Sequence, residues 1–147
     1  MATNHKERLV AIIKAAYASS NPEKAISVIE RCADNLAQYV AAVVAHETRT
    51  TIAFLGQSES SDRELNRQVM ERAAAADKSR RIAHECAIDG VNMINRFAAA
   101  NGVDPIWDGD TSDRWAVADF CLEFVEEIFG SRDAVRTTGI IEKVMTA

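Results

Sequence analysis

Two side chains of complementary chemistry, Asp34 and His84, stand at positions that a helical hairpin would bring together. If the turn is centred near Glu59, the chain before it folds back along the chain after it and Asp34 faces His84. A histidine held by a carboxylate can act as a general base. The alternative is a hydrogen-bonded core histidine or a surface ion pair, because one histidine without a nucleophile is not a catalytic constellation.

Three short polar segments follow one another in the C-terminal half of the chain: Arg80-Arg81-Ile82-Ala83-His84, Asn92-Met93-Ile94-Asn95-Arg96 and Asp113-Arg114-Trp115-Ala116-Val117-Ala118-Asp119-Phe120. This order resembles a bacterial family of small all-helical proteins of unknown function. The resemblance implies no activity. It does imply that His84, Asn95, Asp113 and Arg114 act together, as a polar clamp between the third and fourth helices. With Asp34, these residues form our candidate polar cluster.

The residues near the two histidines of the hairpin, His46 and His84, indicate whether the hairpin could hold a metal. Di-iron helical bundles use Glu-x-x-His motifs, which place both ligands on one helix face. The residues three positions before His46 and His84 are Val43 and Arg81, so neither histidine completes the motif. We therefore expect no metal and no cofactor, and interpret Glu47 with Arg72 as an ion pair between helices.

Oxygen-bearing residues at alternate positions from Asp108 to Ser112 have the spacing of a calcium-binding loop. Asp113 occupies the place of the glycine that such loops require at their sixth position. Asp, Thr and Ser are also the preferred residues for capping a helix N-terminus. We expect a capping loop, with Thr111 or Ser112 as the cap of the fourth helix.

The elements that position these residues are five predicted helices. Apolar residues recur at intervals of three and four, and caps or glycines mark the ends. The ranges are about 3–18, from Asn21-Pro22-Glu23 to Gly56, from Ser61 or Asp62 to Asn101-Gly102, from the capping loop to Gly130, and a short helix after Ser131 with Val135, Ile141 and Val144. We predict an all-α, single-domain helical bundle over residues 1–147, built on the long antiparallel hairpin of the second and third helices.

Residues 79–101 are apolar around most of a helix circumference, which is typical of a helix in the middle of a bundle. The cysteines Cys32, Cys86 and Cys121 all fall on apolar stripes. We therefore expect three buried, reduced thiols and a cytoplasmic protein.

The two long helices are longer than a globule of this size, which is about 40 Å across. Either they kink, near Thr48–Thr51 and at Gly90, or the hairpin end projects from the body. A projecting end that carries apolar residues needs cover, and a second copy is the simplest source of it. The sequence therefore predicts a homodimer through the hairpin, and leaves room for an unknown protein partner.

The formal net charge is −5, from 17 Lys and Arg against 22 Asp and Glu, which argues against nucleic acid as a partner. No apolar run reaches the length of a membrane span, so no membrane association is expected.

Two classes of function remain. The preferred one is an interaction or scaffold module without catalytic activity. The alternative is a small-molecule-binding or hydrolytic bundle with a polar site around His84.

Overall fold

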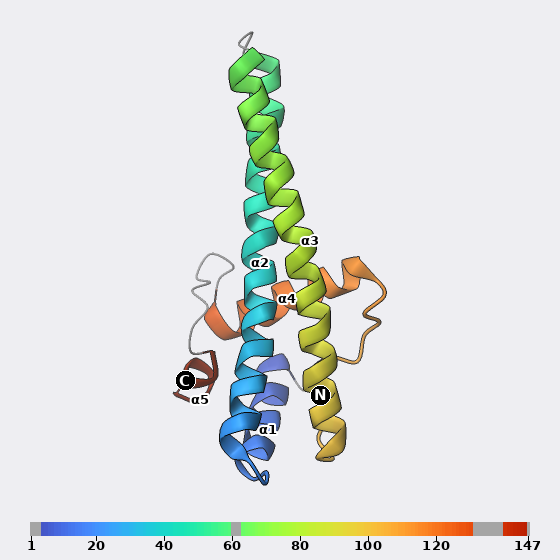
Figure 1. The fold of residues 1–147 in the computed structure, drawn as a ribbon. Helices are drawn as coiled ribbons and strands as arrows, with labels where there is room; N and C mark the ends of the chain where they lie inside the picture. The colour runs from blue at the N-terminus through green and yellow to red at the C-terminus, as the bar shows by residue number, and fades with distance from the viewer. Residues whose placement is uncertain (1–3, 60–62, 131–139, 147) are drawn as a thin grey trace.

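The computed structural model describes residues 4–59, 63–130 and 140–146, and the regular structure of this part of the chain is helical throughout. The five helices are α1 (His5–Tyr17), α2 (Pro22–Glu59), α3 (Arg63–Ala100), α4 (Arg114–Phe129) and α5 (Ile140–Thr146). The predicted all-α fold with a long central hairpin is confirmed (Figure 1). Ser131 and Val135, which we assigned to the last helix, lie outside the described residues, whereas Ile141 and Val144 are buried on α5.

Local chemistry sets the helix ends. Asn21 accepts a hydrogen bond from the amide of Lys24 at 3.4 Å, and α2 begins at Pro22 as predicted. The cap of α4 is Asp113, whose carboxylate accepts from the amides of Trp115 and Ala116, so the expected caps Thr111 and Ser112 are displaced by one or two residues. Gly130 ends α4 with a φ of 78°, a left-handed conformation that glycine adopts without strain.

Helices α2 and α3 are each one continuous helix of 38 residues, about 57 Å long, and they run antiparallel (Figure 1). Of the two alternatives for their length, the projecting hairpin is the one observed. Gly90 does not break α3. It allows close approach instead, because a Cβ atom there would lie 2.9 Å from the backbone carbonyl oxygen of Cys32 on α2.

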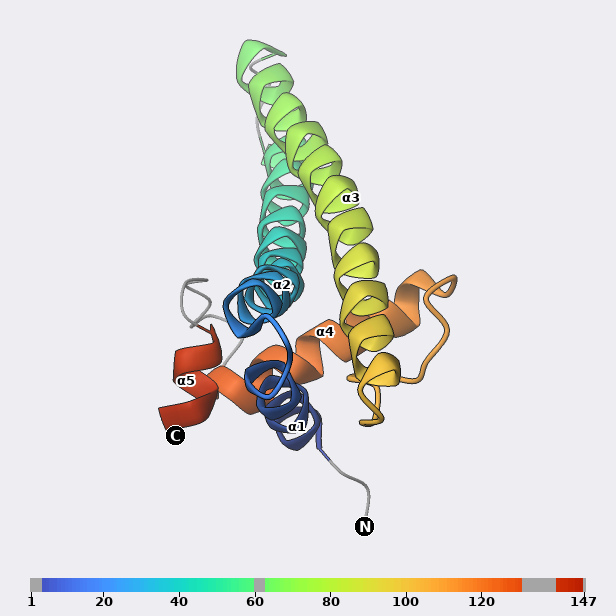
Figure 2. The ribbon, with the colours of Figure 1, turned by 60° about the horizontal axis from the view of Figure 1, so that its bottom comes forward.

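The core lies at one end of the hairpin, where α1, α4 and α5 gather around α2 (Figure 2). Helix α2 packs against all four other helices. The apolar side chains predicted to face inward on α4 are buried: Val117, Cys121, Phe124, Val125 and Ile128. The central helix of the bundle is therefore α2.

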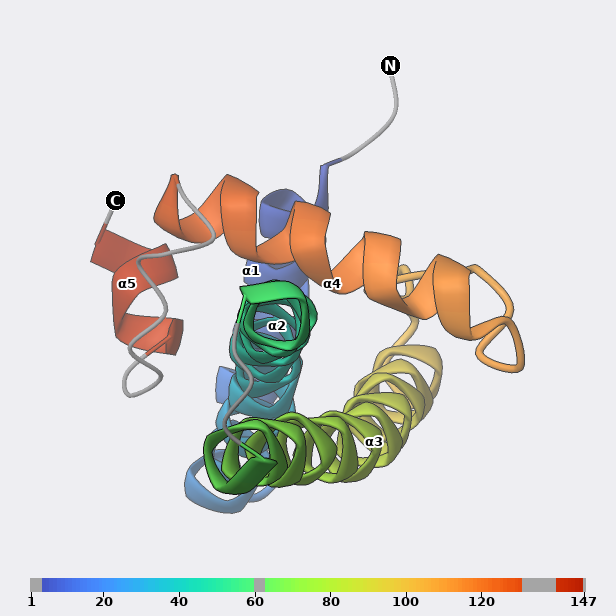
Figure 3. The same cartoon turned by 90° about the horizontal axis from the view of Figure 1, so that it is seen from above.

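Helix α3 lies at the edge and not in the middle of the bundle, which corrects the expectation from its apolar circumference. Seen from above, α3 and α4 lie on different sides of α2 (Figure 3). Large apolar side chains of α3 are in solvent here, with Ile82 56% exposed and Met93, at the edge of the contact with α2, 47% exposed. Cys86 is also exposed, so only Cys32 and Cys121 are the buried thiols we expected.

Beyond the body, the hairpin continues as an arm, defined here as residues 48–59 of α2 and 63–76 of α3 (Figure 1). Among the described side chains of the arm, only Ala53 is buried. A helix with a single neighbour can bury only a narrow stripe, so two helices alone cannot build a core.

Candidate functional site

The contacts between α2 and α3 fix which residues of the hairpin face each other. The imidazole of His46 lies 3.3 Å from the carboxylate of Asp77, and the ring of His84 meets that of Tyr39 edge-on, with centroids 5.3 Å apart. The residue facing His84 is therefore Tyr39, five positions from the expected Asp34. The register differs from that of a turn centred on Glu59.

Asp34 and His84 do not form the carboxylate–histidine pair that we considered, since no hydrogen bond or ion pair joins these two described residues. The buried Oδ1 of Asp34 and Nδ1 of His84 both lack a hydrogen-bond partner within the described chain. Burial is the main cause of the raised pKa of Asp34, about 6, with a smaller effect from Glu30. Asp34 lines a shallow surface hollow with other residues of α2.

Asn95 and Asp113 position the start of α4. The Asn95 amide donates to the carbonyl of Trp107 at 2.8 Å and accepts from the amide of Ile106 at 2.9 Å. It thereby ties the loop before α4 to α3. Asp113 then caps α4, as described above, and the next residue is Arg114. Both side chains act on the backbone that presents Arg114.

A pocket of about 310 Å³ opens where α4 crosses the hairpin. We call it the corner pocket, and it is lined by Tyr39, Val43, His46, Glu47, Arg80, Arg114, Trp115 and Ala118. Of the candidate cluster, only Arg114 lines it directly, while His84 lies behind Tyr39. The structure thus brings Arg114 and His84 to one region and gives Asn95 and Asp113 a supporting position.

An ion-pair network lies beside the corner pocket and includes two of its lining residues, His46 and Arg80. The carboxylate of Asp77 is 2.9 Å from the Arg80 guanidinium, 3.2 Å from that of Arg81 and 3.3 Å from the His46 ring. Bonding to Arg80 is the largest cause of the lowered pKa of Asp77. This network replaces the expected Glu47–Arg72 pair, which is not formed between these two described residues.

The charges of Arg80 and Arg114 act on their buried neighbours. Burial is the main cause of the lowered pKa of His84, and both arginines lower it further. Burial also raises the pKa of Tyr39, whereas Arg80 and Arg114 oppose that rise. Both arginines of the corner pocket thus act electrostatically on Tyr39 and His84, while Glu47 and Asp77 place negative charge close by.

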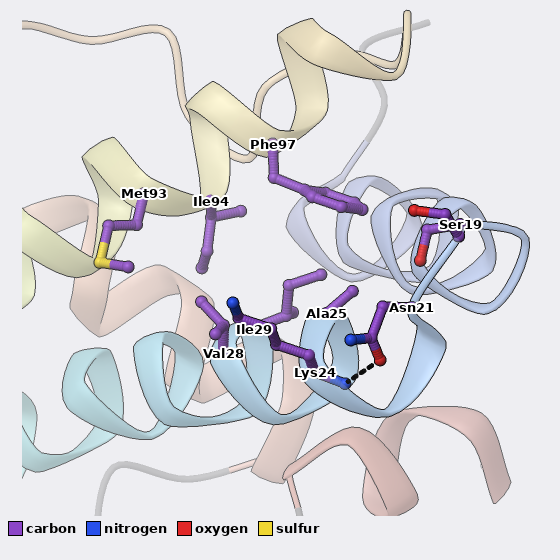
Figure 4. A pocket seen from close by; sticks show the side chains of 10 residues that line it. Ser19, Asn21, Lys24, Ala25, Val28, Ile29, Met93, Ile94 and Phe97 are labelled. Carbon is purple, nitrogen blue, oxygen red and sulfur yellow. Dashed lines mark hydrogen bonds between the residues drawn. The ribbon is translucent and has the colours of Figure 1, made fainter.

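A second pocket, of about 290 Å³, lies between the start of α2 and the end of α3 and is mainly apolar (Figure 4). Met93, Ile94 and Phe97 of α3 face Ala25, Val28 and Ile29 of α2, and the Asn21–Lys24 hydrogen bond closes the α1–α2 side. Neither His84 nor Asn95 lines it. We call it the apolar pocket.

Within the described residues, no group of three or more His, Cys, Asp or Glu side chains is arranged to hold a metal ion. Asp110, in the segment with calcium-like spacing, accepts from the amide and the hydroxyl of Ser112 at 2.9 and 2.7 Å. No helix in the described part of the chain combines the length and apolarity that crossing a membrane requires.

A family described as Protein of unknown function (DUF3232) matches residues 2–134. The chain belongs to this DUF3232 family. The match extends well beyond the C-terminal half in which we noted the resemblance. Neither the curated proteins nor the solved structures gave a match to this DUF3232 chain.

Sequence reasoning missed three residues of the corner pocket of this DUF3232 protein: Tyr39, Arg80 and Trp115. Arg80 and His84 are four residues apart on α3 and so share a helix face, which was a usable signal. With the observed register, that face meets α2 at Tyr39 and Val43.

Proposed function

We propose that this protein is a homodimeric interaction module in which the arms of two copies pack together into a four-helix bundle. The observation that supports it is the change in exposure along one apolar stripe of α2. Ile29, Leu36 and Val40 of this stripe are buried in the body, whereas Leu55, farther along the same stripe, is 52% exposed. The exposed fraction of this apolar stripe is thus larger in the arm than in the body.

A second copy is the occupant that best fits this surface. Ile52 on α2 and Leu65 and Met70 on α3 are also exposed large apolar side chains of the arm. Four antiparallel helices packed at small angles are the common way to bury such stripes. A two-fold dimer supplies the two missing helices from the same sequence.

The size of the arm bears on the strength of the dimer. Each arm is about 20 Å long and two helices wide, so the pairing of two arms removes on the order of 1,000 Å² from solvent. This is near the lower limit for a specific interface. We therefore expect a dimer that dissociates in the micromolar range.

The experiment is a mass measurement by light scattering over micromolar dilution, on the full chain. The proposal expects twice the monomer mass of 16.1 kDa at the high end, falling toward it on dilution. Ile52→Glu should give a monomer at every concentration, with unchanged helical circular dichroism, because a side chain 44% exposed tolerates the change in the monomer.

Ile82→Glu is the matched control, since Ile82 is an equally large exposed side chain on α3 outside the arm. It should leave the dimer intact. A wild-type monomer at all concentrations would overturn the proposal, and so would a dimer broken by Ile82→Glu but not by Ile52→Glu.

We also propose a cytoplasmic location. The cysteines at 32, 86 and 121 are all free thiols, and that at 86 is exposed. Exposed free thiols persist in reducing compartments. Recovery of the protein from the oxidising periplasm or exterior of its cells would contradict this location.

A further inference from the structure

The corner pocket has the features of a ligand site, and this observation is independent of the arm and its self-association. Its volume of about 310 Å³ is at the small end of the range for ligand pockets, which suits a molecule of one or two rings. Three helices contribute to its walls, so its shape depends on the packed body and not on one mobile segment.

Two guanidinium groups face the pocket and differ in their partners. Arg80 is largely buried and is held by Asp77 on its own helix. Arg114 forms no ion pair with any carboxylate in the described part of the chain, and its guanidinium carbon lies 5.0 Å from the ring centre of Trp115. The positive charge of Arg114 is therefore available to a carboxylate, with which guanidinium groups form paired hydrogen bonds.

Trp115 adds a flat apolar surface next to that charge. It is the most exposed of the large apolar side chains in the described structure, at 71%. Nothing in the packing of the body accounts for a tryptophan at this position. Arg114 lies over one face of the indole, and a planar ring stacked on the other face would bury apolar surface on both partners.

Glu47 limits the charge of the ligand. Glu47 is a lining residue of the same pocket as Arg80 and Arg114, and Asp77 already offsets the charge of Arg80. A group with two or three negative charges would meet Glu47 at short range. A ligand with a single negative charge, bound beside Arg114, would meet less repulsion from Glu47.

We propose that the corner pocket binds a small planar monocarboxylate, with its ring on Trp115 and its carboxylate on Arg114. Arg80 and Tyr39 form the polar back of the site. Asn95 and Asp113 are positioning residues, because they fix the loop and the cap that place Arg114.

The test is isothermal titration calorimetry of the full chain with 2-naphthoate as the probe. Two comparison compounds separate the contributions: cyclohexanecarboxylate has the charge without the flat ring, and 2-naphthylmethanol has the ring without the charge. The proposal expects saturable binding of 2-naphthoate and at least about tenfold weaker binding of each comparison compound, the factor that corresponds to 1.4 kcal/mol.

Arg114→Gln and Trp115→Ala should each weaken binding of 2-naphthoate by about tenfold or more, without changing the helical circular dichroism. Both side chains are exposed, so the fold tolerates their loss. Arg96→Gln is the matched control, because Arg96 is an exposed arginine of α3 that does not line the pocket, and it should bind like the wild type.

The proposal would be overturned by no binding of 2-naphthoate at millimolar concentration, by unchanged binding in Arg114→Gln, or by equal weakening in Arg96→Gln. Inorganic phosphate serves as a further competitor. Displacement of 2-naphthoate by phosphate at equal concentration would mean that the site selects charge alone, against the planar ligand class proposed here.

Discussion

At the scale of single residues, burial of the Asp34 carboxyl makes the stability of the folded protein depend on pH. This carboxyl is half-buried on α2 without an ion pair, and burial raises its pKa from 3.8 to about 6. The folded pKa is above the unfolded one, so ionisation of Asp34 is less favourable in the folded protein. The contribution of Asp34 to the free energy of unfolding is therefore highest at low pH, and it decreases as the pH rises from 3.8 to about 6.

Asp34→Asn removes this charge and should raise the free energy of unfolding by about 1 kcal/mol at pH 8. The full shift would correspond to about 3 kcal/mol, and partial exposure of the carboxyl reduces this through screening by water. Urea denaturation at pH 8 and pH 3 measures the effect, which should nearly vanish at pH 3, below the unfolded pKa of 3.8. Asp89→Asn, at an exposed position of α3, is the control. An equal gain from Asp34→Asn at both pH values would contradict the electrostatic origin.

At the scale of elements, several helix ends could be predicted from sequence because capping is local, although α2 passes through Gly56, its predicted end, and continues to Glu59. Asn21-Pro22 and Gly130 mark boundaries that the structure reproduces. The cap of α4 was displaced to Asp113 because several adjacent residues can all cap, and only the path of the loop chooses among them. Asn95 makes that choice by holding residues 106 and 107 to α3.

Asp113→Ala should lower the free energy of unfolding by about 1 kcal/mol, because two amides of the first turn of α4 lose their acceptor. Thermal or urea denaturation measures it. Asp110→Ala is the matched control, since the Asp110 carboxylate accepts from the amide and hydroxyl of Ser112 in the same exposed turn, and the change should cost less than about 0.5 kcal/mol. Equal losses in the two variants would argue against Asp113 as the cap.

Register between helices could not be predicted in the same way. The facing pairs follow from how closely two backbones approach, and the Gly90 contact with the Cys32 carbonyl has no local signature. A small error in the centre of the turn therefore placed Asp34, and not Tyr39, opposite His84. Of the candidate cluster, Arg114 lines the corner pocket and His84 contacts Tyr39, which lines it, while a function for the cluster stays a prediction. The residues that α2 contributes to the pocket were not among the candidates.

At the scale of the whole molecule, the number of neighbours around each helix decides which apolar residues are buried. Helical periodicity identifies the apolar face, but it does not count the helices that cover that face. Residues 79–101 are apolar on nearly every side, yet α3 lies at the edge and exposes Ile82, Cys86 and Met93. Helix α2, with a more ordinary pattern, has four neighbours.

Thiol chemistry tests this arrangement directly. In the native protein one thiol, that of Cys86, should react rapidly with a disulfide reagent, and all three should react after denaturation. Burial raises the pKa of Cys32 and raises that of Cys121 to about 12, so both thiols stay protonated and shielded. Cys86→Ser should abolish the rapid phase. Rapid reaction of all three thiols in native protein would show that the body is less closely packed.

Because α2 runs unbroken from the body into the arm, a rotation of its base displaces its far end. The base of α2 packs against the other helices, and the arm extends about 20 Å beyond the body without a break in the helix. A rotation of about 10° at the base would swing the tip by roughly 4 Å or more. Small repacking around Cys32 and Gly90 would therefore be magnified into displacement at the far end of the molecule.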